Sequence, residues 1–167
     1  MSEEKPLNVP EYLLIRSAEA RAKHLGISVE EALAEIKEES MEPSLHEGDY
    51  VLAVKVSEPL NRGDIVIYEY TPKNIEIIKR VIGLPGETIS NEDGVIKING
   101  KTMNDTWGNG ESVSFEATTL QEDEIFVLGD NRQKSSSDSS SIGAIKVEDC
   151  WKLRYLYWPY HKFKSYE

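Results

Sequence analysis

Ser40 and Lys79 are the two side chains of this 167-residue sequence that point to catalysis by a nucleophile. A serine hydroxyl is a poor nucleophile at its ordinary pKa and needs an adjacent base. No histidine follows Ser40 at a helpful position, but a Ser-Lys pair is an established alternative. Lys79 lies within the apolar run Ile75–Ile82, where burial would favour the neutral amine that accepts a proton. Each residue alone also fits a structural role, Ser40 as a turn serine and Lys79 as a solvent-facing strand lysine.

Four short motifs surround these residues. In chain order they are Ser40–Asp49 (SMEPSLHEGD), Arg62–Val66 (RGDIV), Ile78–Glu87 (IKRVIGLPGE) and Leu128–Arg132 (LGDNR). Their order and spacing resemble the type I signal peptidases, a family of Ser-Lys serine endopeptidases. The C-terminal Trp151–Pro159 is similar to the last strand of that family. The resemblance covers about residues 36–163, and four motifs in order are far more specific than any one of them.

The resemblance implies a site with Ser40 as the nucleophile and Lys79 as the general base. In the family, a serine of the run after the last motif hydrogen-bonds the lysine, and an aspartate of that run forms ion pairs. Residues matched to the supporting positions are Met41, Pro43, Arg80, Asp130, Ser135, Ser136 and Asp138. Pro43 stiffens the chain just after the nucleophile. The resemblance implies no cofactor and no metal.

Two positions depart from the family pattern. The segment between Arg132 and Asp138 has one residue more than the pattern, and Ser140 or Ser141 replaces an expected arginine, for which Arg80 could substitute as the partner of Asp138. The position two before the nucleophile is Gly or Ser in the family and Glu38 here. The charge of a glutamate would oppose a developing oxyanion if the side chain pointed inward.

The elements that must position these residues are mainly β-strands. Runs rich in Val, Ile and Tyr predict strands at Asp49–Val54, Asp64–Tyr70, Ile75–Ile82, Val95–Ile98, Glu124–Leu128 and Trp151–Trp158. Asp93-Gly94 and Asn99-Gly100 predict tight hairpin turns. Closely spaced strands without helices between them favour an antiparallel, mainly β body, and the resemblance implies a β-barrel or sheet of the signal-peptidase type. We expect Ser40 at the edge of the first strand and Lys79 on a neighbouring strand.

The first 36 residues predict a short helical segment before a β domain at residues 37–167. Pro10–Leu25 has helical periodicity, and a capping box at Ser28–Glu31 predicts a second helix from Val29 to about Ile36. This segment could pack on the body or a partner, or replace a membrane anchor and dock a partner. The serine-rich stretch Gly129–Gly143 has the composition of a flexible loop.

Composition narrows the classes of partner. Nineteen basic against thirty acidic residues give a net charge of −11, which argues against nucleic acid as a partner. The single cysteine, Cys150, excludes an internal disulfide and a cysteine-based zinc site, and the three histidines lack ligand spacing. No run approaches the roughly 20 apolar residues of a membrane-spanning helix, and no secretory signal is present. We therefore expect a soluble, cytoplasmic chain, whereas the resemblance implies membrane-anchored relatives with an extracytoplasmic site; aromatic residues from Tyr155 to Phe163 are dense enough for membrane contact.

Three functions fit the sequence. The first is a serine endopeptidase that binds an extended peptide or preprotein as an added strand and cleaves after small residues. The second is a catalytically weak peptide-binding or assembly protein of the same fold, which Glu38 and the altered loop favour. The third is a dedicated processing protease for one soluble partner, similar to the protease that trims nickel superoxide dismutase. Self-cleaving repressors rank last, because the acidic N-terminal segment does not resemble a DNA-binding module.

Overall fold

An eight-stranded antiparallel sheet forms the larger part of the computed structural model, which describes residues 31–70, 72 and 75–166. Its strands in chain order are β1 (Glu31–Glu35), β2 (Tyr50–Lys55), β3 (Ile65–Tyr70), β4 (Ile75–Gly83), β9 (Glu124–Leu128), β10 (Ile145–Lys146), β11 (Cys150–Trp158) and β12 (Lys164–Ser165). They lie in the order β1-β2-β11-β3-β4-β9-β10, and β12 pairs with β11. The strand β11, near the C-terminus, thus lies between the two early strands β2 and β3.

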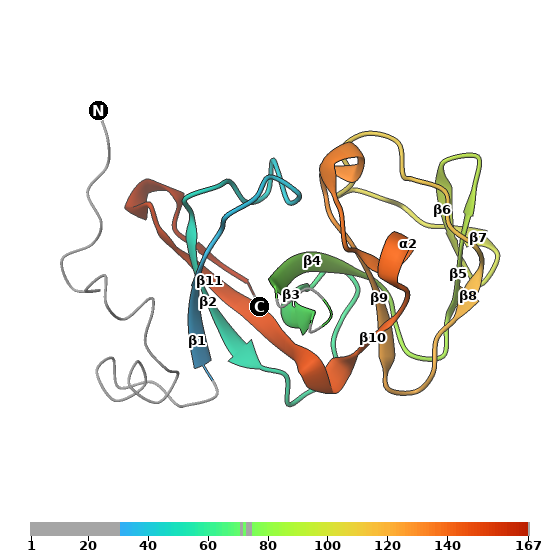
Figure 1. Ribbon diagram of the computed structural model, residues 1–167, viewed down its shortest axis with the longest axis horizontal. Coiled ribbons are helices and arrows are strands. Elements are labelled where there is room, and N and C mark those ends of the chain that lie inside the picture. Colours follow the sequence, from blue (N-terminus) through green and yellow to red (C-terminus); the bar gives the residue numbers. More distant parts are fainter. Residues whose placement is uncertain (1–30, 71, 73–74, 167) are drawn as a thin grey trace.

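A smaller four-stranded sheet lies at one end of the molecule, on the right in Figure 1. It contains β5 (Thr88–Glu92), β6 (Val95–Ile98), β7 (Lys101–Thr102) and β8 (Thr118–Thr119) in the order β7-β6-β5-β8. Both predicted hairpin turns are present. Asp93 and Gly94 have φ angles of 52° and 83°, and Asn99 and Gly100 have 51° and 81°, which is the left-handed geometry that these dipeptides tolerate.

Helices are few and short in the described residues. They are the α-helix α2 (Ser139–Ile142) and the 3₁₀ helices η3 (Arg132–Lys134), η4 (Val147–Asp149) and η5 (Tyr160–Lys162). None of the described helices has the length and apolar character needed to cross a membrane. The expectation of a mainly β, antiparallel body is therefore confirmed.

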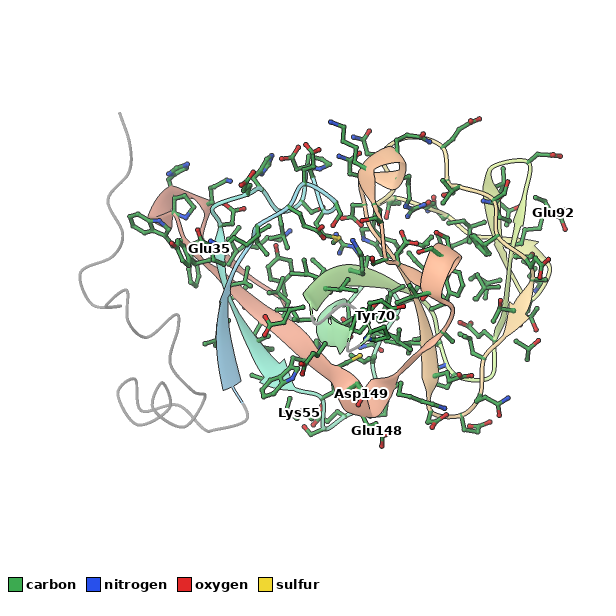
Figure 2. All side chains as sticks on the ribbon, viewed as in Figure 1. Glu35, Lys55, Tyr70, Glu92, Glu148 and Asp149 are labelled. Carbon is green, nitrogen blue, oxygen red and sulfur yellow. The ribbon has the colours of Figure 1, made fainter. Side chains whose placement is uncertain are left out.

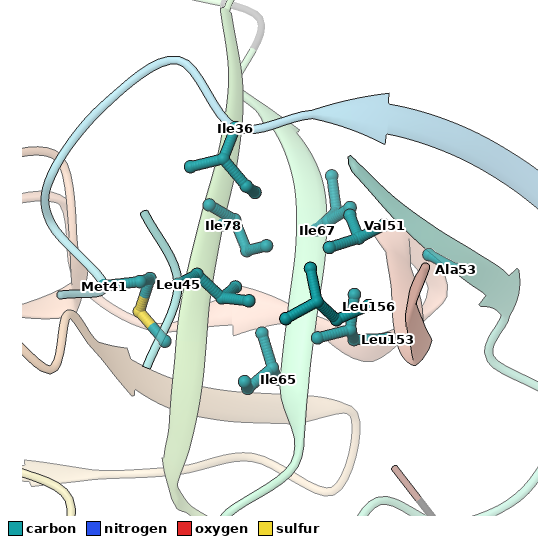
Figure 3. Close-up of a cluster of buried hydrophobic side chains, with 10 residues drawn as sticks. All are labelled: Ile36, Met41, Leu45, Val51, Ala53, Ile65, Ile67, Ile78, Leu153 and Leu156. Atoms are coloured by element: carbon teal, nitrogen blue, oxygen red, sulfur yellow. The ribbon is translucent and has the colours of Figure 1, made fainter. Parts of the chain in front are cut away.

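The larger sheet buries both of its faces, which explains its nearly continuous apolar strands. Along β3, Ile65 and Ile67 belong to one buried cluster, and the alternating Val66 and Tyr68 belong to another. The first cluster is drawn in Figure 3 and comprises Ile36, Met41, Leu45, Val51, Ala53, Ile65, Ile67, Ile78, Leu153 and Leu156. A third cluster joins the two sheets, since it combines Ile82, Phe126 and Leu128 of the larger sheet with Ile89 and Ile96 of the smaller one.

The six predicted strands are present, with bounds that differ by one residue at most. The ends of two of them are also held together outside the ladder, where the Lys55 ammonium of β2 donates to the carbonyl of Glu148, just before β11, at 2.5 Å (Figure 2). Strands β1, β5, β7, β8, β10 and β12 were not predicted.

The predicted second helix is wrong where the structure describes it. Glu31–Glu35 forms β1 and pairs with β2 along its whole length, from Glu31 opposite Val54 to Glu35 opposite Tyr50. Residues with good helix propensity adopt the strand because pairing with a buried strand outweighs a preference of a few tenths of a kcal/mol per residue. The helix predicted at Pro10–Leu25 lies outside the described residues.

Candidate active site

Ser40 lies in the turn between β1 and β2, and not at the edge of a strand as expected. The turn is held by backbone hydrogen bonds from Glu42 to the Glu39 carbonyl at 3.1 Å and from Leu45 to the Met41 carbonyl at 3.0 Å. Met41 and Leu45 are fully buried in the cluster of Figure 3 and anchor the turn to the sheet. Their spacing explains why this segment folds back and buries Ser40, which is only 1% exposed.

Lys79 lies in the middle of β4 and is fully buried. Side chains alternate along a strand, so Lys79 shares its face with Ile77 and Val81, both buried. Burial lowers the pKa of Lys79 from its ordinary value of 10.5, because an ammonium loses its hydration in an apolar environment. The carboxylates of Glu38 and, more weakly, Asp138 act in the opposite direction.

A single carboxylate oxygen connects the two candidate catalytic residues. The Ser40 hydroxyl donates to Oε1 of Glu38 at 2.7 Å, and the Lys79 ammonium donates to the same oxygen at 3.3 Å. Oγ of Ser40 and Nζ of Lys79 therefore lie no farther apart than the sum of these two distances. The Glu38 side chain points toward Ser40 and Lys79, although it remains 48% exposed.

The Leu128–Arg132 motif holds the backbone at Ser40. The amide of Asn131 donates to the Ser40 carbonyl at 2.8 Å, and its side-chain amide donates to the Glu39 carbonyl at 3.1 Å. Gly129 passes so close that a Cβ there would lie 2.7 Å from the Ser40 carbonyl oxygen and 2.3 Å from Oγ of Ser135. The role of Asn131 was not predicted, and only its place within the motif pointed to it.

Arg80 pairs with Asp130, and not with Asp138 as the sequence suggested. Its guanidinium donates to the two Asp130 oxygens at 3.1 and 2.6 Å and to the carbonyl of Gly63 at 2.9 Å. The hydroxyl of Ser44 donates to the same carboxylate at 2.6 Å. All of these groups are buried or half-buried. The network ties the turn that carries Ser40, β4 and the end of β9 together directly beside Lys79.

Asp138 organises the serine-rich segment, which is not the flexible loop that its composition suggested. Its carboxylate accepts from the amide and hydroxyl of Ser140 at the start of α2, and from the hydroxyl of Ser135. The Gly129 amide donates to Oγ of Ser135 at 3.1 Å. Side-chain hydrogen bonds to Asp138 and Ser135 thus fix the segment.

The hydrogen bond from a serine of this run to the lysine is not found in the described residues. Ser135 binds Asp138 and Gly129, and Ser136 is exposed. Tyr68 was not predicted, but its phenol donates to the carbonyl of Ser137 at 3.0 Å and secures the run from the β3 side. Within the described part of the chain, no group of three or more His, Cys, Asp or Glu side chains could hold a metal ion.

The chain is similar in sequence to known proteins of one family. The family described as "Signal peptidase, peptidase S26" matches residues 25–154. A signal peptidase I of Bacillus licheniformis is 31% identical over 141 residues, covering 75% of this chain and 76% of that relative. A signal peptidase I of Bacillus caldolyticus is 31% identical over 147 residues, covering 77% and 80%. The crystal structure of a signal peptidase I from Enterococcus faecalis V583 aligns with a TM-score of 0.49 and 26% identity, covering 59% of this chain and 98% of that one.

These matches define the class of the protein as a peptidase. More particularly, the chain belongs to the signal peptidase family, peptidase S26, and is a signal peptidase I-like protein.

Proposed function

We propose that this chain is a serine endopeptidase in which Ser40 is the nucleophile and Lys79 the general base. The observation that carries the proposal is a fully buried lysine that shares one carboxylate oxygen with a buried serine. Burial lowers the pKa of Lys79, so its neutral form becomes accessible nearer to physiological pH. A purely structural role does not explain a lysine here, since burying an amine costs free energy of folding.

The reaction follows from these two groups. Oγ of Ser40 forms a bond to the carbonyl carbon of the scissile peptide while neutral Lys79 takes the hydroxyl proton. The resulting Lys79 ammonium gives that proton to the departing amine as the C–N bond breaks, which leaves an acyl group on Ser40. Water then loses a proton to Lys79 and attacks the ester, and the proton returns to Oγ as the carboxylic product leaves. No redox partner is needed, and the lysine ends as it began.

The proposed substrate is an extended polypeptide, such as a preprotein, with small residues before the cleaved bond. Relatives named signal peptidase I support a preprotein as the substrate. An extended chain can bind as an added strand, in which alternate side chains enter pockets. Small pockets beside Ser40 would then select residues such as alanine.

One observation favours a second function, a peptide-binding protein with weak catalysis. The Ser40 hydroxyl donates to Glu38 and not directly to Lys79. A carboxylate in this position would also oppose negative charge on a nearby carbonyl oxygen. Such a protein would bind an extended peptide and release it uncut.

Cleavage of a reporter peptide distinguishes the two functions. We expect hydrolysis after alanine in an extended peptide, with one new N-terminus found by mass spectrometry. Ser40→Ala should abolish cleavage, whereas Ser57→Ala, which alters an exposed serine on the loop after β2, should cleave at the wild-type rate. Binding of the peptide without cleavage by the wild-type protein would instead support the second function.

A further inference from the structure

Glu38 is a third member of the site that neither the proposed mechanism nor the matched motifs use. Its Oε1 atom receives the Ser40 hydroxyl at 2.7 Å and the Lys79 ammonium at 3.3 Å. While Ser40 donates to this oxygen, its proton points to Glu38 and away from the lysine that must remove it. The two catalytic groups are therefore close together but not yet in the arrangement that the reaction needs.

The charged groups around Lys79 favour the ammonium form that donates to Glu38. Glu38 faces the amine from the nucleophile turn and Asp138 from the serine-rich segment, and both carboxylates favour the ammonium form. Arg80 on the same strand is occupied by Asp130. Tyr68 of β3 donates its phenolic proton to Ser137, and burial raises its pKa, so it stays neutral. Of the two carboxylates, Glu38 alone hydrogen-bonds Lys79 in the described structure.

The Glu38 side chain is the one member of the site that can leave without disturbing the core. Ser40 and Lys79 are buried, whereas Glu38 is 48% exposed. Rotation of its carboxylate into water would lose two hydrogen bonds but regain full hydration. A substrate strand that covers the nucleophile would remove the remaining water from the carboxylate, which makes its departure favourable.

We propose that Glu38 is a latch that holds Ser40 and Lys79 in a resting arrangement and must swing out for the pair to react. This inference rests on the proposed function. In the latched form the ammonium and the serine hydroxyl both donate to Glu38. When Glu38 leaves, Lys79 loses a proton to solvent, and its neutral amine accepts the hydroxyl proton of Ser40 as the bond to the substrate carbonyl forms.

Two substitutions of Glu38 test the latch. Glu38→Gln removes the charge and keeps the length of the side chain, and Glu38→Ser also removes its reach. The measurements are kcat/KM for an alanine-containing reporter peptide between pH 6 and 10 and the pKa of Lys79, followed by NMR of the lysine side chain. Glu39→Gln is the matched control, because Glu39 is adjacent, carries the same charge and pairs with exposed Lys134.

We expect both Glu38 variants to lower the midpoint of the pH profile and the Lys79 pKa by about one unit, since an opposite charge nearby is removed. The rate of both at a pH below the midpoint should then rise about tenfold. Glu38→Ser should also exceed the wild-type rate on the alkaline plateau, where freeing the Ser40 hydroxyl is the remaining effect. Glu39→Gln should match the wild type in every measurement.

The results separate failure of the latch from failure of the proposed function. Unchanged midpoints, or a slower Glu38→Ser variant in an enzyme that cleaves the peptide, would overturn the latch and leave the peptidase intact. Absence of cleavage in the wild type and in both variants would overturn the proposed function. If no protein cleaves the peptide, the NMR measurement still tests the contact between Glu38 and the Lys79 ammonium. A Lys79 pKa that is the same in the wild type and in both Glu38 variants would overturn that contact as well.

Discussion

The burial of Lys79 lowers the stability of the fold. An amine with no exposed surface lies among isoleucine and valine side chains, with one hydrogen-bonded carboxylate to offset its lost hydration. Such a burial is costly in free energy unless the group is neutral or well paired. In the proposed mechanism, the same burial lets Lys79 act as a base at moderate pH. Stability and reactivity at this position therefore oppose each other.

Lys79→Met should remove peptidase activity and make the protein more stable at neutral pH. The lysine pKa is lower in the folded than in the unfolded chain, so below the folded pKa the full cost of charging the buried amine is present. Between the two pKa values the unfolded chain binds more protons, and the wild-type unfolding free energy rises with pH. Methionine should therefore add about 1–4 kcal/mol at pH 7, and this gain should shrink as the pH approaches the ordinary lysine pKa of 10.5.

Urea unfolding at several pH values measures this difference. Lys134→Met is the control, because that lysine is exposed and its loss should change stability by less than about 0.5 kcal/mol. A Lys79→Met protein less stable than the wild type at pH 7 would mean that the amine is paired well enough to stabilise the fold, and would remove the argument for a lowered pKa.

The buried ion pair beside Lys79 should behave in the opposite way when it is broken. Asp130 is fully buried and neutralises Arg80 through two hydrogen bonds. Asp130→Asn leaves a buried guanidinium without its counter-charge and should cost about 3–5 kcal/mol of unfolding free energy. Asp123→Asn, which breaks an exposed pair with Lys146, should cost no more than about 1 kcal/mol. Equal losses in chemical denaturation would contradict the structural role given to Asp130.

At the scale of elements, the segment that follows β9 supports the turn that carries Ser40, the proposed nucleophile. It delivers the Asn131 amide to the Ser40 carbonyl and brings Gly129 so close that an added Cβ would meet the same oxygen. Asp138 then fixes the remainder of the segment through Ser135 and the start of α2. Two segments about ninety residues apart in the chain thus behave as one unit.

Gly129→Ala should disrupt this contact and reduce activity at least tenfold. The added Cβ would lie 2.7 Å from the Ser40 carbonyl oxygen, so the nucleophile turn or the segment must move, at a cost of about 1–3 kcal/mol. Gly100→Ala is the control, because its Cβ meets nothing within 4 Å and its positive φ costs about 1 kcal/mol far from the site. Peptide cleavage and thermal unfolding of both variants give the comparison. A fully active Gly129→Ala enzyme would show that the close approach is not needed.

The sequence predicts the elements whose conformation is determined by their own residues. Six strands rich in β-branched residues and two turns with Asp-Gly or Asn-Gly are found where expected, because burial and left-handed φ angles are local requirements. The sequence predicts a helix over Glu31–Glu35, since these five residues favour one, and only the pairing with β2 makes the segment a strand. The suggested pairing of Arg80 with Asp138 was also wrong, since Arg80 pairs with Asp130 and Asp138 binds serines. Both depend on how the end of β9 meets β4, which spacing along the chain does not specify.

The motifs brought Ser40 and Lys79 to attention, but the sequence could not show what lies between them. The inward direction of Glu38 depends on the conformation of a turn. The sequence indicated only that an inward-pointing Glu38 would oppose a developing oxyanion. Asn131 acts through hydrogen bonds to two backbone carbonyls and Tyr68 through a hydrogen bond to one, and the residue type alone does not indicate such contacts.

At the scale of the whole molecule, the two sheets share one core. Ile89 of β5 is fully buried in the cluster that also contains Phe126 and Leu128 of β9. The site lies on the larger sheet, but the strand β9 that leads into its supporting segment is also packed against the smaller sheet. Loss of the smaller sheet would therefore loosen the site.

The protein should unfold in a single cooperative transition. Calorimetry, and denaturation followed by near- and far-ultraviolet circular dichroism, should give coincident curves. Ile89→Ala should lower the midpoint and cost about 2–5 kcal/mol without splitting the transition, whereas Val95→Ala on the exposed hairpin should cost less than about 0.5 kcal/mol. Two separate transitions would show that the sheets are independent units.

The most direct test of the account is to identify the residue that carries the acyl group during turnover. An ester of a short peptide ending in alanine is mixed with the enzyme, the reaction is stopped with acid, and the modified peptide is located by mass spectrometry. We predict one acyl group per chain, on Ser40, that is absent from Ser40→Ala and Lys79→Met. An acyl group on a residue other than Ser40 would contradict the assignment of this pair. Acylation of Ser40 in Lys79→Met to the same extent as in the wild type would also contradict it, and would direct attention to another base, such as His46.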